Sequence, residues 1–167
     1  MNALPIIPPV ADVTLGPGGF YFGEGCTRIH TLLGSCVAIT LWHPKRHIGG
    51  MCHYLLPTRG LNQHLGKGHY ADEAIQLFLQ AIKKAHTRPE EYEAKIFGGA
   101  NMFHSLGGGD SDMNVSRRNV EIGDRLLRQY GFRIRGRDVG GIHHRKIYLE
   151  LWNGDVWVRR TKSVHQN

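Results

Sequence analysis

The sequence predicts an α+β fold, a single-domain layered sandwich of mostly antiparallel strands with two main helices. Short apolar segments rich in Thr, Val and Ile are separated by polar turns, which is typical of strands. Two longer segments carry apolar residues at helical spacing. The elements follow one another as strands, helix, strand, helix and strands, an order that favours an α+β domain. The length of 167 residues suits one domain. We therefore expect one domain over 1–167, with 1–12 a loosely ordered N-terminal segment.

The first third of the chain predicts a β-hairpin. Residues 16–25 are rich in glycine and form either a loop or an irregular strand. Residues 29–42 are apolar and β-branched, which indicates a strand. Residues 43–47 are polar and contain proline, which indicates a turn. Residues 48–56 form a second apolar strand that ends at Pro57.

The middle of the chain predicts two helices with a short strand between them. In residues 70–86 the apolar side chains lie on one helical face. Residues 94–97 form a strand that two glycines end, and residues 105–114 are a loop rich in glycine and aspartate. The second helix spans residues 115–130, and Gly131 is well placed to terminate it.

The last part of the chain predicts three further strands. Residues 132–139 form the first of them. Residues 146–152 and 156–160 form a hairpin around Asn153-Gly154, a dipeptide that favours a type I′ turn.

Charge and hydropathy exclude several classes of function. The net charge of +7 is scattered along the chain, and no recognised nucleic-acid-binding module accompanies it, so we expect no nucleic-acid partner. No apolar run approaches the ~20 residues that span a bilayer, so we expect no membrane insertion. Residues 1–13 lack the basic region of a signal peptide. The sequence therefore predicts a cytoplasmic protein.

The cysteines and histidines predict neither a disulfide framework nor a metal site. Three cysteines without a C-x-x-C pair fit a reducing compartment. Four histidines considered as metal ligands lack zinc-ligand spacing; they are His64, His69, His143 and His144. Residues 107–112 lack the lysine of a P-loop and the spacing of a calcium loop, so we expect a flexible loop there. Cys26 has no assigned role.

The hairpin brings a thiol and an imidazole onto adjacent strands. Cys36 follows Gly34-Ser35, and such small residues let the backbone approach a substrate and direct N–H groups at an oxyanion. If residues 36–42 pair with 48–54, opposing position numbers sum to 89 or 90. A sum of 89 places His53 opposite Cys36, whereas 90 turns His53 to the other face. Cys52 then faces away from the site.

Other residues beside this pair have two interpretations each. Ser35 either helps to bind an oxyanion or is a small turn residue. Gly98 and Gly99 either line a substrate cleft or support the strand that carries Cys36, because glycine serves both purposes.

Several motifs in this order resemble the CheD family. They are the runs 31–38 (TLLGSCVA), 49–57 (GGMCHYLLP) and 95–103 (KIFGGANMF), with Tyr70-Ala71-Asp72 and the Gly140-Gly141 segment before Arg145-Lys146. The resemblance covers nearly the whole chain after about residue 12. It implies the α/β sandwich fold of the CheD and toxin deamidases and the deamidation of glutamines on chemoreceptors.

The resemblance also implies roles for single residues. Cys36 matches the nucleophile and His53 the base of a Cys, His and Thr triad. In some relatives the threonine precedes the cysteine by six residues, a position that His30 occupies here. Thr31, five residues before Cys36, has the expected residue type and is preferred, with His30 as the alternative. No metal or cofactor is needed.

Three functions follow as alternatives. The first is a cysteine-dependent protein-glutamine amidohydrolase whose partners are chemoreceptor cytoplasmic domains. The second is an adaptor of the chemotaxis pathway that binds receptors or a CheC-type phosphatase. The third is a basic protein that binds nucleic acid or metal.

Overall fold

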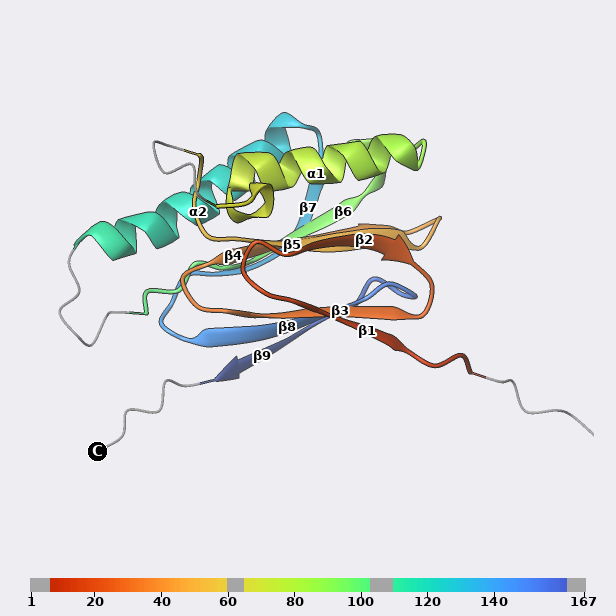
Figure 1. Ribbon diagram of the computed structural model, residues 1–167, viewed down its shortest axis with the longest axis horizontal. Coiled ribbons are helices and arrows are strands. Elements are labelled where there is room, and N and C mark those ends of the chain that lie inside the picture. Colours follow the sequence, from red (N-terminus) through yellow and green to blue (C-terminus); the bar gives the residue numbers. More distant parts are fainter. Residues whose placement is uncertain (1–6, 60–64, 103–109, 162–167) are drawn as a thin grey trace, which may run out of the picture.

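The computed structural model describes residues 7–59, 65–102 and 110–161, and only the backbone of residues 110–113. The described part is a three-layered α+β sandwich, as predicted (Figure 1). Two helices cover one face of a five-stranded sheet, and a four-stranded sheet packs against its other face. Among the described residues, no helix is long and apolar enough to cross a membrane.

The two sheets combine strands from distant parts of the chain. The four-stranded sheet has the order β1 (Ala11–Leu15), β3 (Thr27–Leu33), β8 (His144–Glu150) and β9 (Val156–Thr161). The five-stranded sheet has the order β2 (Phe20–Glu24), β5 (Ile48–Tyr54), β4 (Val37–His43), β6 (Glu93–Gly98) and β7 (Arg133–Val139). The pairs β1–β3 and β6–β7 are parallel and the other paired strands are antiparallel.

The helices lie close to their predicted positions. The first is α1 (Ala71–Lys84), whose predicted apolar face is buried against the sheet. The second, α2 (Asp110–Gln129), begins five residues earlier than predicted. The aspartates at its start were interpreted as loop residues, but acidic residues also favour the first turn of a helix because they complement its dipole. The rest of the predicted glycine-rich loop, residues 105–109, lies outside the described residues.

The predicted continuous strand over residues 29–42 is wrong. This segment is two strands, β3 and β4, that belong to different sheets. The chain crosses between the sheets at Gly34, Ser35 and Cys36. A run of apolar residues does not reveal this crossing, because both strands contribute buried apolar side chains to the sandwich.

Two smaller predictions also need correction. The turn after β8 spans five residues between Glu150 and Val156. Gly154 has a φ of 78°, but Asn153 is not among the described residues with positive φ, so this is not the two-residue type I′ turn. At the N-terminus, Ala11 and Asp12 belong to β1 rather than to a loosely ordered segment.

The core has two parts, one on each face of the five-stranded sheet. One cluster lies between this sheet and the helices and includes Val37, Cys52 and Tyr54. The other lies between the two sheets and includes Ala38 and Met51. Because successive side chains of β4 and β5 point to opposite faces of the sheet, each one points toward one of these two clusters.

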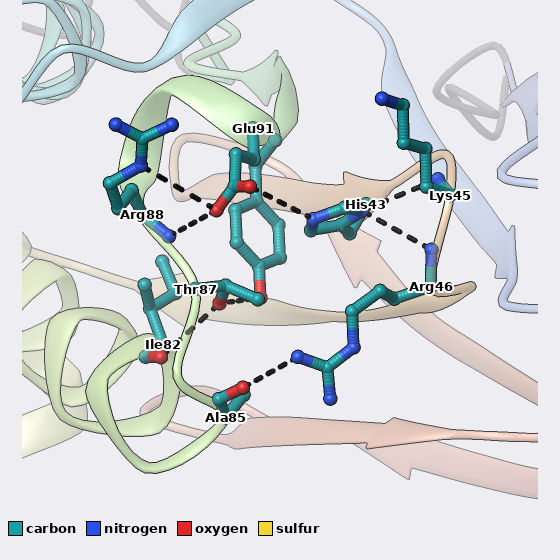
Figure 2. A network of polar contacts seen from close by, with 9 residues as sticks. His43, Lys45, Arg46, Ile82, Ala85, Thr87, Arg88 and Glu91 are labelled. Carbon is teal, nitrogen blue, oxygen red and sulfur yellow. Dashed lines mark hydrogen bonds and ion pairs between the residues drawn. The ribbon is translucent and has the colours of Figure 1, made fainter.

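The hairpin between β4 and β5 has a register that the sequence did not predict. Ala38 lies opposite His53, so opposing position numbers sum to 91. The reason is that His43, interpreted as a turn residue, is the last residue of β4 and is 4% exposed. Its Nδ1 accepts hydrogen bonds from the backbone N–H groups of Lys45 (3.3 Å) and Arg46 (3.2 Å), as Figure 2 shows. The turn is thus shortened to residues 44–47.

Contacts from the helix layer hold the same hairpin in place. In Figure 2, Nε2 of His43 lies 3.9 Å from Oε1 of Glu91, and the Arg46 guanidinium donates to the Ala85 carbonyl at 2.6 Å. At the other end of the hairpin, the Tyr54 hydroxyl donates to the Asn119 carbonyl of α2 at 2.6 Å. The position of β5 is therefore fixed from both ends.

Candidate active site

Cys36 lies where the chain crosses from one sheet to the other. Two backbone hydrogen bonds hold this crossing: Ala100 N–H donates to the Gly34 carbonyl (3.0 Å) and Gly99 N–H to the Cys36 carbonyl (2.8 Å). The Cys36 side chain is partly exposed and packs against the cluster between the sheets. Cys36 is thus anchored through its backbone, and the residue remains partly exposed.

Gly98 and Gly99 have different structural roles. Gly98 has a φ of 108°, and a Cβ there would overlap the Cys36 carbonyl oxygen, so only glycine lets β6 pass so close. Gly98 therefore supports the segment that carries Cys36. Gly99 also lines a surface groove of about 460 Å³ with Asn101, Arg117 and Gly141 among its other walls.

His53 lies in β5 with its side chain between the two sheets. It is 2% exposed, and its Nδ1 lies 2.7 Å from the Thr31 hydroxyl oxygen across the sandwich. The His53 N–H donates to the Gly19 carbonyl, and the His53 carbonyl accepts from the Gly18 N–H. The imidazole is therefore held both at its backbone and at one ring nitrogen.

The hydrogen bonds of Thr31 determine the tautomer of His53. The Thr31 hydroxyl donates its single proton to the Leu15 carbonyl at 2.7 Å. It can only accept in its second contact, so Nδ1 of His53 carries the proton and donates. Nε2 is then the nitrogen with the free lone pair, and it has no hydrogen-bond partner among the described residues. In this arrangement Nε2 of His53 is the ring nitrogen that can accept a proton.

His30, the alternative to Thr31, faces away from His53. Its Nε2 contacts the Thr14 hydroxyl at 3.0 Å, and its ring packs near Tyr148. In β3 the buried residues alternate with the less buried ones, and Thr31 belongs to the buried set. Consecutive strand residues point to opposite faces, so only Thr31 reaches the space between the sheets.

The observed register brings Cys36 and His53 to the same layer but not directly opposite each other. The observed sum is 91, so neither of the two alternatives left open by the sequence, 89 and 90, is the actual pairing. A shift of two positions, from 89 to 91, preserves the face on which each side chain lies. Both Cys36 and His53 therefore lie on the side of the second sheet, and Cys52 faces the helices, away from these two side chains.

Burial favours the neutral forms of the Cys36 thiol and the His53 imidazole. The pKa of the Cys36 thiol is raised by burial, and a hydrogen bond with the Ser35 side chain offsets part of this rise. Burial, and to a lesser extent the charge of His69, lowers the pKa of His53 to about 4. At neutral pH the site therefore holds a thiol and a neutral imidazole rather than an ion pair.

Other predicted residues lie apart from this site or outside the described part of the chain. Cys26 donates weakly to the Pro8 carbonyl at 3.7 Å, and His64 is not among the described residues. No group of three or more metal-ligating side chains occurs among the described residues.

Two contributors to the site were missed by sequence reasoning. Leu15 contributes through its backbone carbonyl, and a backbone role leaves no signal in residue type. His69 influences His53 electrostatically, although from the sequence it was considered only as a metal ligand.

Comparisons with known proteins agree with the resemblance seen in the motifs. The family model described as "CheD chemotactic sensory transduction" matches residues 55–160. A protein of Dechloromonas aromatica (strain RCB), "Probable chemoreceptor glutamine deamidase CheD 3", is 49% identical over 148 residues, which are 88% of this chain and 86% of that protein. "Probable chemoreceptor glutamine deamidase CheD" of Pseudomonas savastanoi pv. phaseolicola is 45% identical over 150 residues, 90% of this chain and 85% of that protein.

Among solved structures, Bacillus licheniformis hypothetical protein YfiH aligns with a TM-score of 0.47 and 14% sequence identity. The alignment covers 71% of this chain and 49% of that chain.

Proposed function

Since the chain belongs to the CheD family, we propose that it deamidates glutamine side chains of chemoreceptor cytoplasmic domains, with Cys36 as nucleophile and His53 as base. The overall reaction converts the glutamine amide and water to glutamate and ammonia. The observation that carries the proposal is the chain of contacts from Leu15 through Thr31 to His53, which leaves Nε2 as the free proton acceptor. We place the reaction in the cytoplasm, where cysteines stay reduced.

In the first half of the reaction the Cys36 sulfur attacks the amide carbon. Since the thiol is neutral at rest, its proton must pass to Nε2 of His53 as the S–C bond forms. The resulting imidazolium retains its Nδ1–H bond to Thr31, and Nε2 then protonates the departing amide nitrogen. Ammonia leaves and a thioester with Cys36 remains.

The second half returns the enzyme to its starting state. A water molecule attacks the thioester carbon while Nε2 of His53 takes its proton. The tetrahedral species collapses, the C–S bond breaks, and the sulfur regains the proton from His53. Backbone N–H groups of the Gly34–Cys36 crossing, or the Ser35 hydroxyl, supply the donors that stabilise the negative oxygen.

The test is incubation of the protein with chemoreceptor cytoplasmic domains from its own organism, followed by peptide mass spectrometry for amide-to-acid conversion. We expect conversion with the wild type and with Cys26→Ala, whose thiol lies away from the site. Cys36→Ala should be inactive, because no other group can form the thioester. Conversion by Cys36→Ala at the wild-type rate would refute the mechanism, and no conversion by the wild type would refute the function. Binding to a CheC-type phosphatase stays a separate prediction.

A further inference from the structure

Arg145 is a buried charge that the proposed chemistry does not use. It lies in β8 opposite Leu33, the residue before the crossing that carries Cys36, and it is 4% exposed. Among the described residues it is the only lysine or arginine in the buried class. Burying a guanidinium is costly unless it is paired and hydrogen-bonded, so its partners indicate what it holds in place.

The partners of Arg145 lie in β7 of the other sheet and in the segment that follows it. Its Nε donates to Oδ1 of Asp138 at 3.1 Å, and its Nη2 donates to the Gly140 carbonyl at 2.7 Å. Asp138 belongs to β7 of the five-stranded sheet. Arg145 therefore holds the segment that connects β7 to β8. This segment leads from one sheet to the other (Figure 1).

Backbone hydrogen bonds connect this segment to Cys36. Gly140 N–H donates to the Gly98 carbonyl at 2.9 Å, and Asn101 N–H donates to the Gly141 carbonyl at 2.8 Å. The residues between these two anchors, Gly99 and Ala100, are those whose N–H groups hold the carbonyls of Cys36 and Gly34. An unbroken series of contacts thus runs from the guanidinium to the nucleophile.

We propose that Arg145 and Asp138 are positioning residues for Cys36, and this inference rests on the proposed function. The ion pair fixes the segment after β7, this segment fixes Gly98–Ala100, and those residues fix the crossing. Hydrogen bonds from charged donors are stronger than neutral ones, which suits the first link of such a series. Small displacements of a reacting group lower the rate steeply, so the effect should appear in kcat.

Arg160 offers a matched control on the same carboxylate. Its Nη2 donates to Oδ2 of Asp138 at 2.8 Å, but its side chain is 62% exposed. Among the described residues, the side-chain hydrogen bonds of Arg160 go to Asp138 alone. Loss of Arg160 therefore removes a cation from Asp138 while the contact between Arg145 and Gly140 remains.

The experiment compares Arg145→Lys, Asp138→Asn and Arg160→Met in steady-state deamidation and in amide hydrogen exchange. A lysine can contact either Asp138 or Gly140, but it lacks the guanidinium fork that bonds both. We expect Arg145→Lys and Asp138→Asn to lower kcat at least tenfold while KM changes less than threefold. The Gly99 and Ala100 amides should exchange at least tenfold faster in both, and Arg160→Met should stay within twofold of the wild type.

Two results would overturn the inference. One is a fall in kcat that only matches the fraction of unfolded protein, measured by thermal melting of each variant. The other is unchanged exchange at Gly99 and Ala100 in folded Arg145→Lys. If the wild type deamidates no receptor, the proposed function fails, but the exchange measurement still decides whether Arg145 orders the crossing. If Arg145→Lys does not fold, Asp138→Asn gives the same comparison against Arg160→Met.

Discussion

At the scale of single residues, the hydroxyl of Thr31 decides which nitrogen of His53 carries a proton. The hydroxyl has one proton and gives it to the Leu15 carbonyl, so it must accept from Nδ1 of His53. The Leu15 carbonyl, which accepts the hydrogen bond of the Thr31 hydroxyl, therefore determines the tautomer of His53 in the other sheet. The same logic explains why a threonine or serine suits this position and an aliphatic residue of equal size does not.

Thr31→Val should lower kcat by about 10–100-fold, because the base loses its preferred tautomer and orientation. Thr31→Ser keeps the hydroxyl and should retain most of the activity. His30→Ala is the control on the neighbouring residue, which faces Thr14 rather than His53, and it should have a smaller effect than Thr31→Val. Steady-state kinetics on one receptor fragment measures all three, and a larger loss at His30 would contradict the role given to Thr31.

At the scale of elements, the crossing from β3 to β4 and the hairpin from β4 to β5 create the site together. The crossing puts Cys36 at the edge of the space between the sheets, and the hairpin directs His53 into that space. Gly98 permits the crossing, because its missing Cβ lets β6 approach the Cys36 carbonyl.

Gly98→Ala should therefore displace the crossing, and its kcat should fall by more than the loss of stability alone explains. The substitution adds backbone strain of about 1–3 kcal/mol at positive φ and an overlap with the Cys36 carbonyl. Gly25→Ala is the matched control, because Gly25 also has a positive φ of 79° but has no atom within 4 Å of the added Cβ. We expect kcat to fall at least tenfold in Gly98→Ala and to stay within twofold in Gly25→Ala. Equal activities in the two folded variants would show that the contact with Cys36 is unimportant.

Much of the element pattern could be predicted, but the pairing of the hairpin could not. The helical face of α1 and the alternation in β8 follow directly from residue type. The register depends on His43, a polar residue that is buried because its ring accepts hydrogen bonds from the following turn and lies near Glu91. Polarity alone indicated a turn there. Of the two registers left open, only 89 put Cys36 and His53 on one face; the observed register does so too, because it differs from 89 by an even number of positions.

At the scale of the whole molecule, the sandwich buries ionisable groups whose partners come from distant strands. His53 and Thr31 belong to different sheets, as do Arg145 and Asp138. Such pairs cannot be recognised in the sequence, because their residue types depend on contacts between distant strands and not on local secondary-structure propensity. The resemblance to a family implied roles for Cys36 and His53 and left Thr31 and His30 as alternatives for the third residue, whereas the contact between Thr31 and His53 depends on the fold.

The buried imidazole should also make the stability of the whole protein depend on pH. The pKa of His53 is lowered from 6.5 to about 4 in the folded protein, so between these values the unfolded chain binds more protons. Stability from this group is complete above pH about 6.5 and falls as the pH drops toward 4, by about 3 kcal/mol in all. Urea unfolding of the wild type and His53→Gln at about pH 7.5 and about pH 4 measures this difference. An equal pH dependence in both proteins would contradict the lowered pKa.

The most direct test of the account is interception of the thioester on Cys36. Hydroxylamine attacks thioesters, so a reaction run in its presence should convert the receptor glutamine to a hydroxamate, detected by peptide mass spectrometry. We predict hydroxamate with the wild type, a lower yield with Thr31→Val, and none with Cys36→Ala. Formation of glutamate by the wild type without any hydroxamate, or of hydroxamate by Cys36→Ala at the wild-type rate, would contradict a covalent mechanism at this cysteine.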